Sequence, residues 1–391
     1  MAFMDTANIT LFTEIYLKQE LISQVYSYVG HRTSSEGLIK TTDKKSPGNK
    51  FFSFSYVPEY METIVSEPAL WTEKVFPSVK GYAIELDDFT DVDDYLKKHL
   101  KKRRENIKRA AKRLETCFDI TYKMFQNDIR EDEYLFLMGE MKGLIVKRFQ
   151  QKGKKSENIA NWDKILSTSL ELIKKGKASI FAIYNNNHPI AISFNYNFPS
   201  LLFGYISSYD IAYSKFSLGQ LLIYKQLQWC IENNYSQFDM GWGDMEYKRW
   251  WSNKIYRFNH RIIYPKHSFP GFLYAFWKGN TSRVLAFLIS KGVNDHWNKF
   301  KLKLKGDTKI LMRTPTYRLE DMSISEMDAL KETYLNQRNQ LPVTDQMIND
   351  FLFLTKEHSK NVTLHYLKSK NLYVLKGKNK TKAILINPEN D

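Results

Sequence analysis

The alternation of apolar and polar residues near the middle of the chain predicts a strand, a polar loop, a helix and a second strand. Residues 201–207 form an apolar run with the length and composition of a strand. A polar turn at 208–217 separates this run from residues 218–233, where apolar side chains recur at roughly helical spacing. Residues 235–240 form the next predicted strand. This order is typical of a βαβ unit, whose helix N-terminus is a natural binding position for an anion.

The ends of these elements carry the residues best suited to chemistry. Gly219 would let the first turn of the helix approach a ligand closely, and the Ser217 hydroxyl can donate a hydrogen bond. The second strand ends in a glycine-flanked acidic cluster, followed one turn later by a phenol and an amine: Asp239, Asp244, Tyr247 and Lys248. The region therefore combines a candidate anion site with candidate acid–base groups.

Two motifs lie in this region. The first, S-x-G-x-L-L, runs from Ser217 to Leu222, and the second, F-D-x-G-x-G-D-x-x-Y-K, runs from Phe238 to Lys248. Together they resemble the CelD-like branch of the GNAT acyltransferase superfamily, which is related to the Fem-type peptidoglycan aminoacyl transferases. The resemblance covers roughly residues 50–265 and implies two GNAT-like halves in one chain.

The resemblance also implies roles for individual residues. Backbone N–H groups at the helix start would hold the pyrophosphate of acyl-CoA, with acetyl-CoA as the simplest donor. The expected donor contacts are Ser217, Leu218, Gly219 and Gln220. A general base would take the proton of the acceptor amine, with Asp239 and Asp244 as candidates, and Tyr247 would protonate the leaving thiolate. Either carboxylate could instead hydrogen-bond the Gly-Trp-Gly turn.

Acceptor binding is predicted for four residues. Lys248 could bind an acceptor carboxylate or phosphate, or could pair with the aspartate four residues before it. Tyr209 lies in the polar turn before the helix start. Arg103 and Arg104 interrupt the apolar stripe of a helix predicted at 92–115, so one guanidinium is expected to reach an anionic group. The alternative is that both side chains extend to water from the helix edge.

The remaining pattern completes a predicted α/β (α+β) fold. Further helices are predicted at 12–29, 131–149, 159–174, 324–336 and 344–356. Further strands are predicted at 51–57, 79–86, 120–122, 178–184, 189–197, 256–264, 372–376 and 382–386. We therefore expect two GNAT-like halves with mixed sheets flanked by helices at 1–118 and 119–265, amphipathic and basic connecting helices at 266–306, and a small α+β appendage at 307–391.

Composition narrows the function classes. Aromatic residues make up 15% of the 391 residues, so the chain is expected to fold. No uncharged apolar run reaches the roughly 18 residues that span a bilayer, and the N-terminus lacks a signal-peptide pattern, so a cytoplasmic protein is expected. Cys117 and Cys230 are expected to be buried free thiols, and no Cys/His cluster in the sequence suggests a metal.

The net charge of +15 would attract several kinds of anionic partner. Nucleic acid, an anionic membrane surface and phosphorylated substrates such as CoA thioesters are all candidate partners. Alternatively, an AT-rich genome can encode lysine-rich, basic proteins without any selected ligand. Residues 269–277 and 284–289 are apolar, with Lys278 and Arg283 between them. This segment is expected either to pack on the main body or to rest on a membrane surface, with a basic tail at 299–305.

These observations favour an N-acyltransferase that moves an acyl group from acyl-CoA to an amine acceptor in cell-envelope polysaccharide or lipid biosynthesis. Two alternatives remain. One is an aminoacyl-tRNA-dependent transferase of Fem type, for which the positive charge and the arginine helix would follow an RNA backbone. The other is a non-catalytic module that binds envelope polysaccharide. The sequence contains no hydrolase, NTPase, dinucleotide-binding or zincin motif.

Overall fold

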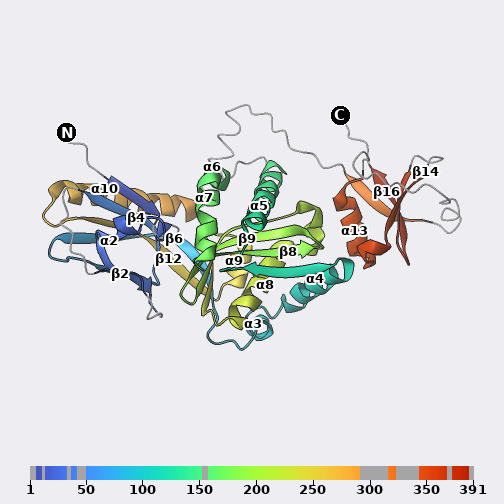
Figure 1. Ribbon diagram of the computed structural model, residues 1–391, viewed down its shortest axis with the longest axis horizontal. Coiled ribbons are helices and arrows are strands. Elements are labelled where there is room, and N and C mark those ends of the chain that lie inside the picture. Colours follow the sequence, from blue (N-terminus) through green and yellow to red (C-terminus); the bar gives the residue numbers. More distant parts are fainter. Residues whose placement is uncertain are drawn as a thin grey trace, which may run out of the picture. The chain divides into compact units, whose positions relative to one another are not determined.

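A computed structural model describes most of the chain as two compact units. The described residues are 6–10, 14–32, 37–41, 50–151, 157–290, 316–322, 343–367 and 372–386. Unit 1 comprises Met1–Leu100, Asn195–Tyr205 and Trp229–Thr308, and unit 2 comprises Lys101–Phe194, Ile206–Gln228 and Lys309–Asp391. Both contain strands and helices, which confirms the predicted α/β class with mixed sheets flanked by helices (Figure 1). The predicted division into four domains stays a prediction.

Unit 1 is built on a mixed sheet. In sheet order, its strands are β1 (Thr6–Thr10), β4 (Phe51–Pro58), β12 (Lys254–Pro265), β6 (Trp71–Glu85), β11 (Gln237–Trp242) and the first part of β10 (Leu201–Tyr209). The pairs β1–β4 and β10–β11 are parallel, whereas the pairs from β4 through β12 and β6 to β11 are antiparallel. The parallel β10–β11 pair, with α8 (Leu218–Glu232) between the two strands in sequence, confirms the predicted βαβ unit.

A smaller antiparallel sheet near the N-terminus corrects one prediction. Its strands, in order, are β3 (Gly37–Lys40), β2 (Tyr26–His31) and β5 (Met61–Val65). The helix predicted at 12–29 is wrong, because residues 26–29 belong to β2 and α2 spans only Gln19–Ser23. The segment Tyr26–His31 contains two tyrosines and one valine, and pairing with strands on both sides overrides its apparent helical spacing.

A second correction concerns the arginine helix. The helix predicted at 92–115 is two helices, α3 (Val92–His99) in unit 1 and α4 (Arg104–Cys117) in unit 2. Leu100 leaves helical geometry with φ −107° and ψ 34°. The break follows Leu100, at the start of the polar run 101–106 that interrupts the apolar stripe.

Unit 2 contains the predicted meander and its helices. The strands are the first part of β9 (His188–Phe198), then β8 (Ala178–Asn185) and β7 (Ile120–Phe125), and the helices are α4, α5 (Glu131–Gln151), α6 (Glu157–Ala160), α7 (Trp162–Lys174) and most of α8. The polar turn before α8 is a 3₁₀ segment, η1 (Ile211–Phe216). The predicted order of strands and helices is confirmed here. In this part of the sequence, turns rich in Gly and Asn separate the apolar runs, so the element limits can be recognised locally.

The C-terminal appendage belongs to unit 2. It has an antiparallel sheet of β13 (Tyr317–Asp321), β16 (Thr381–Ile386), β15 (Leu372–Lys376) and β14 (Thr363–Leu367), together with α13 (Asp345–Thr355). The helix at 344–356 and both hairpin strands are therefore confirmed, while the helix predicted at 324–336 lies outside the described residues. Between β14 and α13 lies a short 3₁₀ turn, η3 (Ser359–Asn361).

Helix α13 packs directly on η1 and α4. The Phe353 ring meets the Phe216 ring edge-on at 5.3 Å, and the Arg113 guanidinium lies over the Phe353 ring at 5.0 Å. The Asn349 amide donates to the carbonyl of Ala212 at 3.2 Å. The appendage therefore supports the segment that leads into α8.

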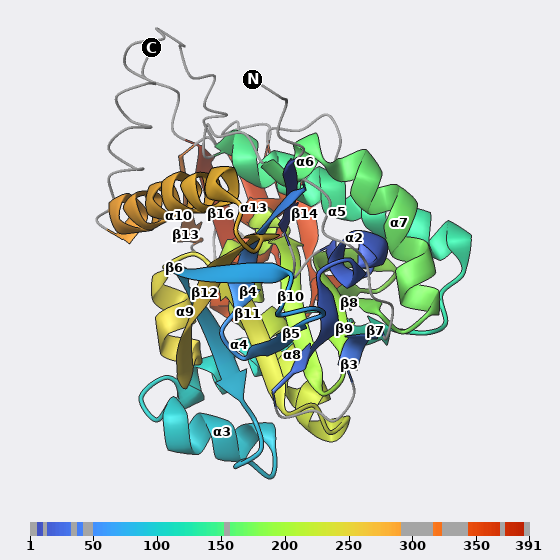
Figure 2. The ribbon, with the colours of Figure 1, turned by 90° about the vertical axis from the view of Figure 1, so that its left-hand side faces the viewer.

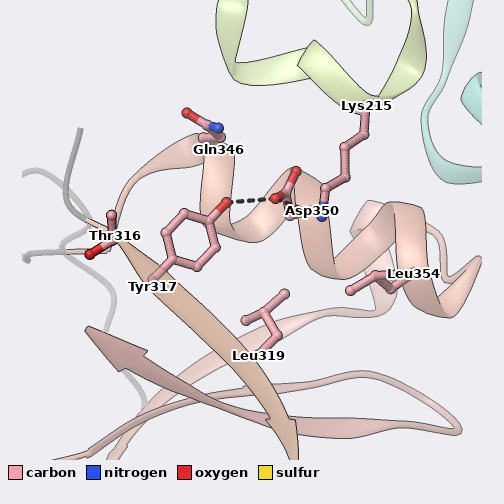
Figure 3. Close-up of a pocket in the computed structure, with 7 residues that line it drawn as sticks. All are labelled: Lys215, Thr316, Tyr317, Leu319, Gln346, Asp350 and Leu354. Atoms are coloured by element: carbon pink, nitrogen blue, oxygen red, sulfur yellow. Dashed lines mark hydrogen bonds and ion pairs between the residues drawn. The ribbon is translucent and has the colours of Figure 1, made fainter. Parts of the chain in front are cut away.

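A pocket of about 380 Å³ lies at this contact (Figure 3). Lys215 from η1 forms an ion pair with Asp350 at 2.9 Å, and the Tyr317 hydroxyl donates to the same carboxylate at 2.6 Å. Thr316, Leu319, Gln346 and Leu354 complete the lining. Since Asp350 is buried, its carboxylate ties the appendage to η1.

The last described element of unit 1 is α10 (Phe269–Ser290), a single helix over both predicted apolar stretches that lies beside β6 and β12 (Figure 2). None of the helices in the described part of the chain combines the length and apolarity of a membrane-spanning segment. Both cysteines are buried free thiols, as predicted. Burial raises the pKa of each thiol, so neither is a thiolate nucleophile at neutral pH.

We expect Asp350→Asn to lower the free energy of unfolding by about 1–2 kcal/mol, because it removes the buried carboxylate that accepts the Tyr317 hydroxyl and pairs with Lys215. Urea unfolding measures the change. The matched control is Asp128→Asn, an exposed aspartate of unit 2, which should change stability by less than about 0.5 kcal/mol. Equal effects of the two variants would contradict a bracing role for Asp350.

Candidate functional site

The Gly-Trp-Gly turn at the end of β11 has a backbone that requires its glycines. Gly241 has φ +69° and Gly243 has φ +101°, a region that residues with a side chain rarely adopt. The pairing of β11 with β6 shifts register between Asp239 and Trp242, which is a bulge at the end of the ladder. The Trp242 ring stacks on Tyr56 at 4.6 Å. The turn therefore has a defined shape that re-aims the chain after Asp239.

Asp239 lies at the centre of a buried polar group, which we call the Asp239 cluster: Asp239, Tyr60, Tyr256 and Lys248. The Asp239 side chain is fully buried. Its Oδ2 accepts the hydroxyls of Tyr60 and Tyr256, each at 2.5 Å, and its Oδ1 accepts the N–H of Gly241 at 2.6 Å. All three partners donate, which suits an ionised carboxylate that can only accept.

Two groups of the Asp239 cluster, Asp239 and Lys248, have pKa values close to neutrality. Burial raises the pKa of Asp239 from 3.8 to about 6, although its three hydrogen bonds and the charge of Lys248 act in the opposite direction. Burial also lowers the pKa of Lys248 from 10.5 to about 8, against the attraction of Asp239. A carboxylate and an amine with such pKa values can exchange protons under physiological conditions.

Asp244 has a different environment. Its carboxylate is about half exposed, accepts the Tyr82 hydroxyl at 2.6 Å and pairs with Arg249 at 2.9 Å. The Lys248 ammonium donates to the carbonyl of Trp242 at 2.5 Å, so the ion pair of Asp244 is with Arg249 rather than with Lys248. Tyr247 is half-buried in the short helix α9 (Glu246–Trp251).

The predicted donor-binding residues lie at the start of α8. Ser217 adopts the left-handed conformation with φ 58°, and its carbonyl accepts the N–H groups of Gln220 and Leu221. Of the first-turn N–H groups, those of Leu218 and Gly219 have no acceptor within the helix by helical geometry. A Cβ atom on Gly219 would lie 3.0 Å from the Tyr209 ring, so glycine allows that ring to rest against the first turn.

Arg148 adds a cation to this helix start. Its guanidinium, from α5, lies over the Tyr209 ring at 4.6 Å. No motif marks Arg148 in the sequence, because it lies far from the Ser217–Leu222 motif along the chain. Arg103 and Arg104, at the start of α4, are half-buried, and the Arg104 guanidinium lies 3.6 Å from the Glu105 carboxylate.

The structure thus places the predicted residues in two groups, one in each unit. Unit 1 holds Asp239, Asp244, Tyr247 and Lys248, and unit 2 holds Arg103, Arg104, Tyr209, Ser217, Leu218, Gly219 and Gln220. Tyr60 and Tyr256 are the residues that sequence reasoning missed in the first group. No local signal marks them, because each lies far from Asp239 in sequence or on another strand. In the described residues, no cluster of three or more His, Cys, Asp or Glu side chains could hold a metal.

A model of the family described as Acetyltransferase (GNAT) domain matches residues 101–249. No curated protein matches the chain. Solved structures with similarity include a conserved protein of unknown function from Bacteroides thetaiotaomicron VPI-5482, with 12% identity, a TM-score of 0.37, and coverage of 55% of this chain and 70% of that chain.

L-PGS from Bacillus licheniformis shows 14% identity, a TM-score of 0.36, and coverage of 62% of this chain and 74% of that chain. FemX shows 10% identity, a TM-score of 0.36, and coverage of 46% and 61%. These similarities are too low to carry an argument about substrates. The family match includes both motifs identified in the sequence, from Ser217 to Leu222 and from Phe238 to Lys248. Residues 101–249 are therefore similar to the GNAT domain of acetyltransferases.

Proposed function

We propose that this protein is an N-acyltransferase that transfers an acyl group from acyl-CoA to an amine acceptor, in the biosynthesis of a cell-envelope polysaccharide or lipid. The observation that carries the proposal is the backbone geometry at the start of α8, within a matched GNAT domain. Acetyl-CoA is the simplest donor. A membrane surface is a further candidate partner, because α10 exposes apolar side chains.

Donor binding is assigned to the start of α8. The left-handed Ser217 ends the 3₁₀ turn at the start of a 15-residue helix, and the N–H groups of Leu218 and Gly219 would donate to a pyrophosphate there. The Tyr209 ring and the Arg148 guanidinium lie beside this turn and would supply a stacking surface and a positive charge. Ser217, Leu218, Gly219 and Gln220 keep their predicted role in donor binding.

The role of general base is assigned to Asp239. Its pKa of about 6 is closer to neutrality than the pKa of an ordinary aspartate, which suits proton transfer at neutral pH. Asp239 is buried, while Tyr60, which donates to it, is partly exposed. The neutral amine would form the new bond to the acyl carbonyl, and as that bond forms Tyr60 would take a proton from the nitrogen and pass its own hydroxyl proton to Asp239. The carbon–sulfur bond then breaks, and Tyr247 would protonate the thiolate.

Asp244 and Lys248 are assigned to acceptor binding, with Asp244 kept as the second candidate base because it is accessible to a substrate. Arg103 and Arg104 would contact an anionic group of the acceptor. An aminoacyl-tRNA donor is the alternative, supported only by the net charge of +15. If aminoacyl-tRNA is the donor, the protein should bind tRNA with an affinity that falls steeply as salt increases. If the protein is a non-catalytic polysaccharide-binding module, it should bind neither acyl-CoA nor tRNA.

Gly219→Val should weaken acetyl-CoA binding by about tenfold or more, because the new side chain displaces the Tyr209 ring and covers the first N–H groups of α8. Calorimetric titration with acetyl-CoA measures the affinity. The control is Gly143→Val, the same change on α5 at a position where an added Cβ meets no atom within 4 Å. Unchanged affinity in a folded Gly219→Val variant would place the donor elsewhere.

Asp239→Asn should reduce turnover by about 100-fold or more, the usual scale for loss of a general base, while acetyl-CoA affinity persists. For the unchanged protein, protonation of Asp239 removes the base, so kcat/KM should fall as pH drops through about 6. Release of CoA with a panel of amines provides the assay. Asp244→Asn is the comparison, and a loss confined to that variant would transfer the role of base to Asp244.

Lys248→Met should move the acid limb of this pH profile to higher pH. The Lys248 charge lowers the pKa of Asp239, so its removal lets the pKa of Asp239 rise above about 6. Rate profiles of the variant and the unchanged protein measure the shift. An increase in the acceptor KM without a shift would instead make Lys248 a direct acceptor contact.

A further inference from the structure

Helix α10 has its small residues on the side that faces the protein. Gly271, Ala275 and Gly279 recur at intervals of four and are buried. A Cβ on Gly271 would lie 2.7 Å from the Tyr264 ring, and a Cβ on Gly279 would lie 2.2 Å from the Phe76 ring. The helix therefore lies close against β12 and β6 through positions that carry almost no side chain.

The large apolar side chains of α10 point away from the protein. Half of the exposed large apolar residues in the described chain, nine of eighteen, belong to this one helix. Eight of them form the surface that we call the α10 face: Phe269, Phe272, Leu273, Phe276, Trp277, Val284, Leu285 and Leu288. Trp277 is 68% exposed, and Phe269 is 69% exposed. This is the reverse of an ordinary surface helix, in which large apolar residues face the core.

The charges of α10 identify the partner. The helix contains no aspartate or glutamate, and its two charged residues, Lys278 and Arg283, are exposed. By helical spacing they fall on opposite borders of the α10 face. The Arg283 guanidinium also lies over the Phe76 ring at 5.0 Å, beside the sheet. Cations that flank a row of aromatic and aliphatic side chains match the headgroups and acyl chains of an anionic bilayer.

We propose that α10 is a membrane-docking helix that lies in the interface of an anionic bilayer with the α10 face inserted. A helix of 22 residues with tryptophan and phenylalanine outward and cations at its borders suits the plane of the interface. The net charge of +15 adds long-range attraction to the same surface. The docking does not depend on acyl transfer, so each can fail without the other.

The test is flotation of the full chain with vesicles of phosphatidylcholine alone or with about one third phosphatidylserine. We expect binding to the anionic vesicles that weakens in high salt, and much weaker binding to the neutral ones. Phe276→Ser combined with Trp277→Ser should reduce binding by about tenfold or more, since both side chains are exposed and the fold does not depend on them.

The matched control is Leu135→Ser combined with Phe136→Ser, two adjacent exposed apolar residues on α5, which should leave vesicle binding unchanged. Equal loss in both double variants, or no binding by the unchanged protein, would overturn the proposal. Light scattering provides a second readout. A dimer that becomes a monomer only in the Phe276→Ser/Trp277→Ser variant would assign the α10 face to a second copy of the chain instead.

Discussion

The buried carboxylate of Asp239 imposes the strongest constraint on unit 1. An anion without solvent needs donors, and these come from the chain between β4 and β5, from β12 and from the turn after β11. The Tyr256 ring reaches Asp239 across β6, where a Cβ on Gly81 would lie 2.2 Å from that ring. Several strands must therefore be in register before the carboxylate is satisfied, which links the sheet to the candidate base.

The same arrangement explains why the pKa of Asp239 is only moderately raised. Burial alone favours the protonated form, whereas three hydrogen bonds and a nearby ammonium favour the carboxylate. Lys248 experiences the complementary balance, and its pKa falls to about 8. The opposition of desolvation and pairing leaves two groups near neutrality, the range in which proton transfer to or from a substrate is efficient.

The two units use peripheral elements in different ways. In unit 2, α13 of the appendage packs on η1, so a segment late in the sequence stabilises the approach to the predicted donor loop. In unit 1, α10 packs through glycines and alanine and leaves its large side chains outside. Helix α13 thus packs its large side chains on a neighbouring segment, whereas α10 packs through small residues and leaves its large side chains on the surface.

The sequence by itself determined the local elements around both motifs. The βαβ unit, the glycines at 241 and 243 and the hairpin at 372–386 follow from periodicity and turn chemistry, which act over a few residues. Only the tertiary structure decided that Asp239 is buried with Tyr60 and Tyr256, that Asp244 pairs with Arg249, and that α3 and α4 are separate helices. Those outcomes depend on burial and on contacts between distant segments, and neither leaves a periodic signal in the chain.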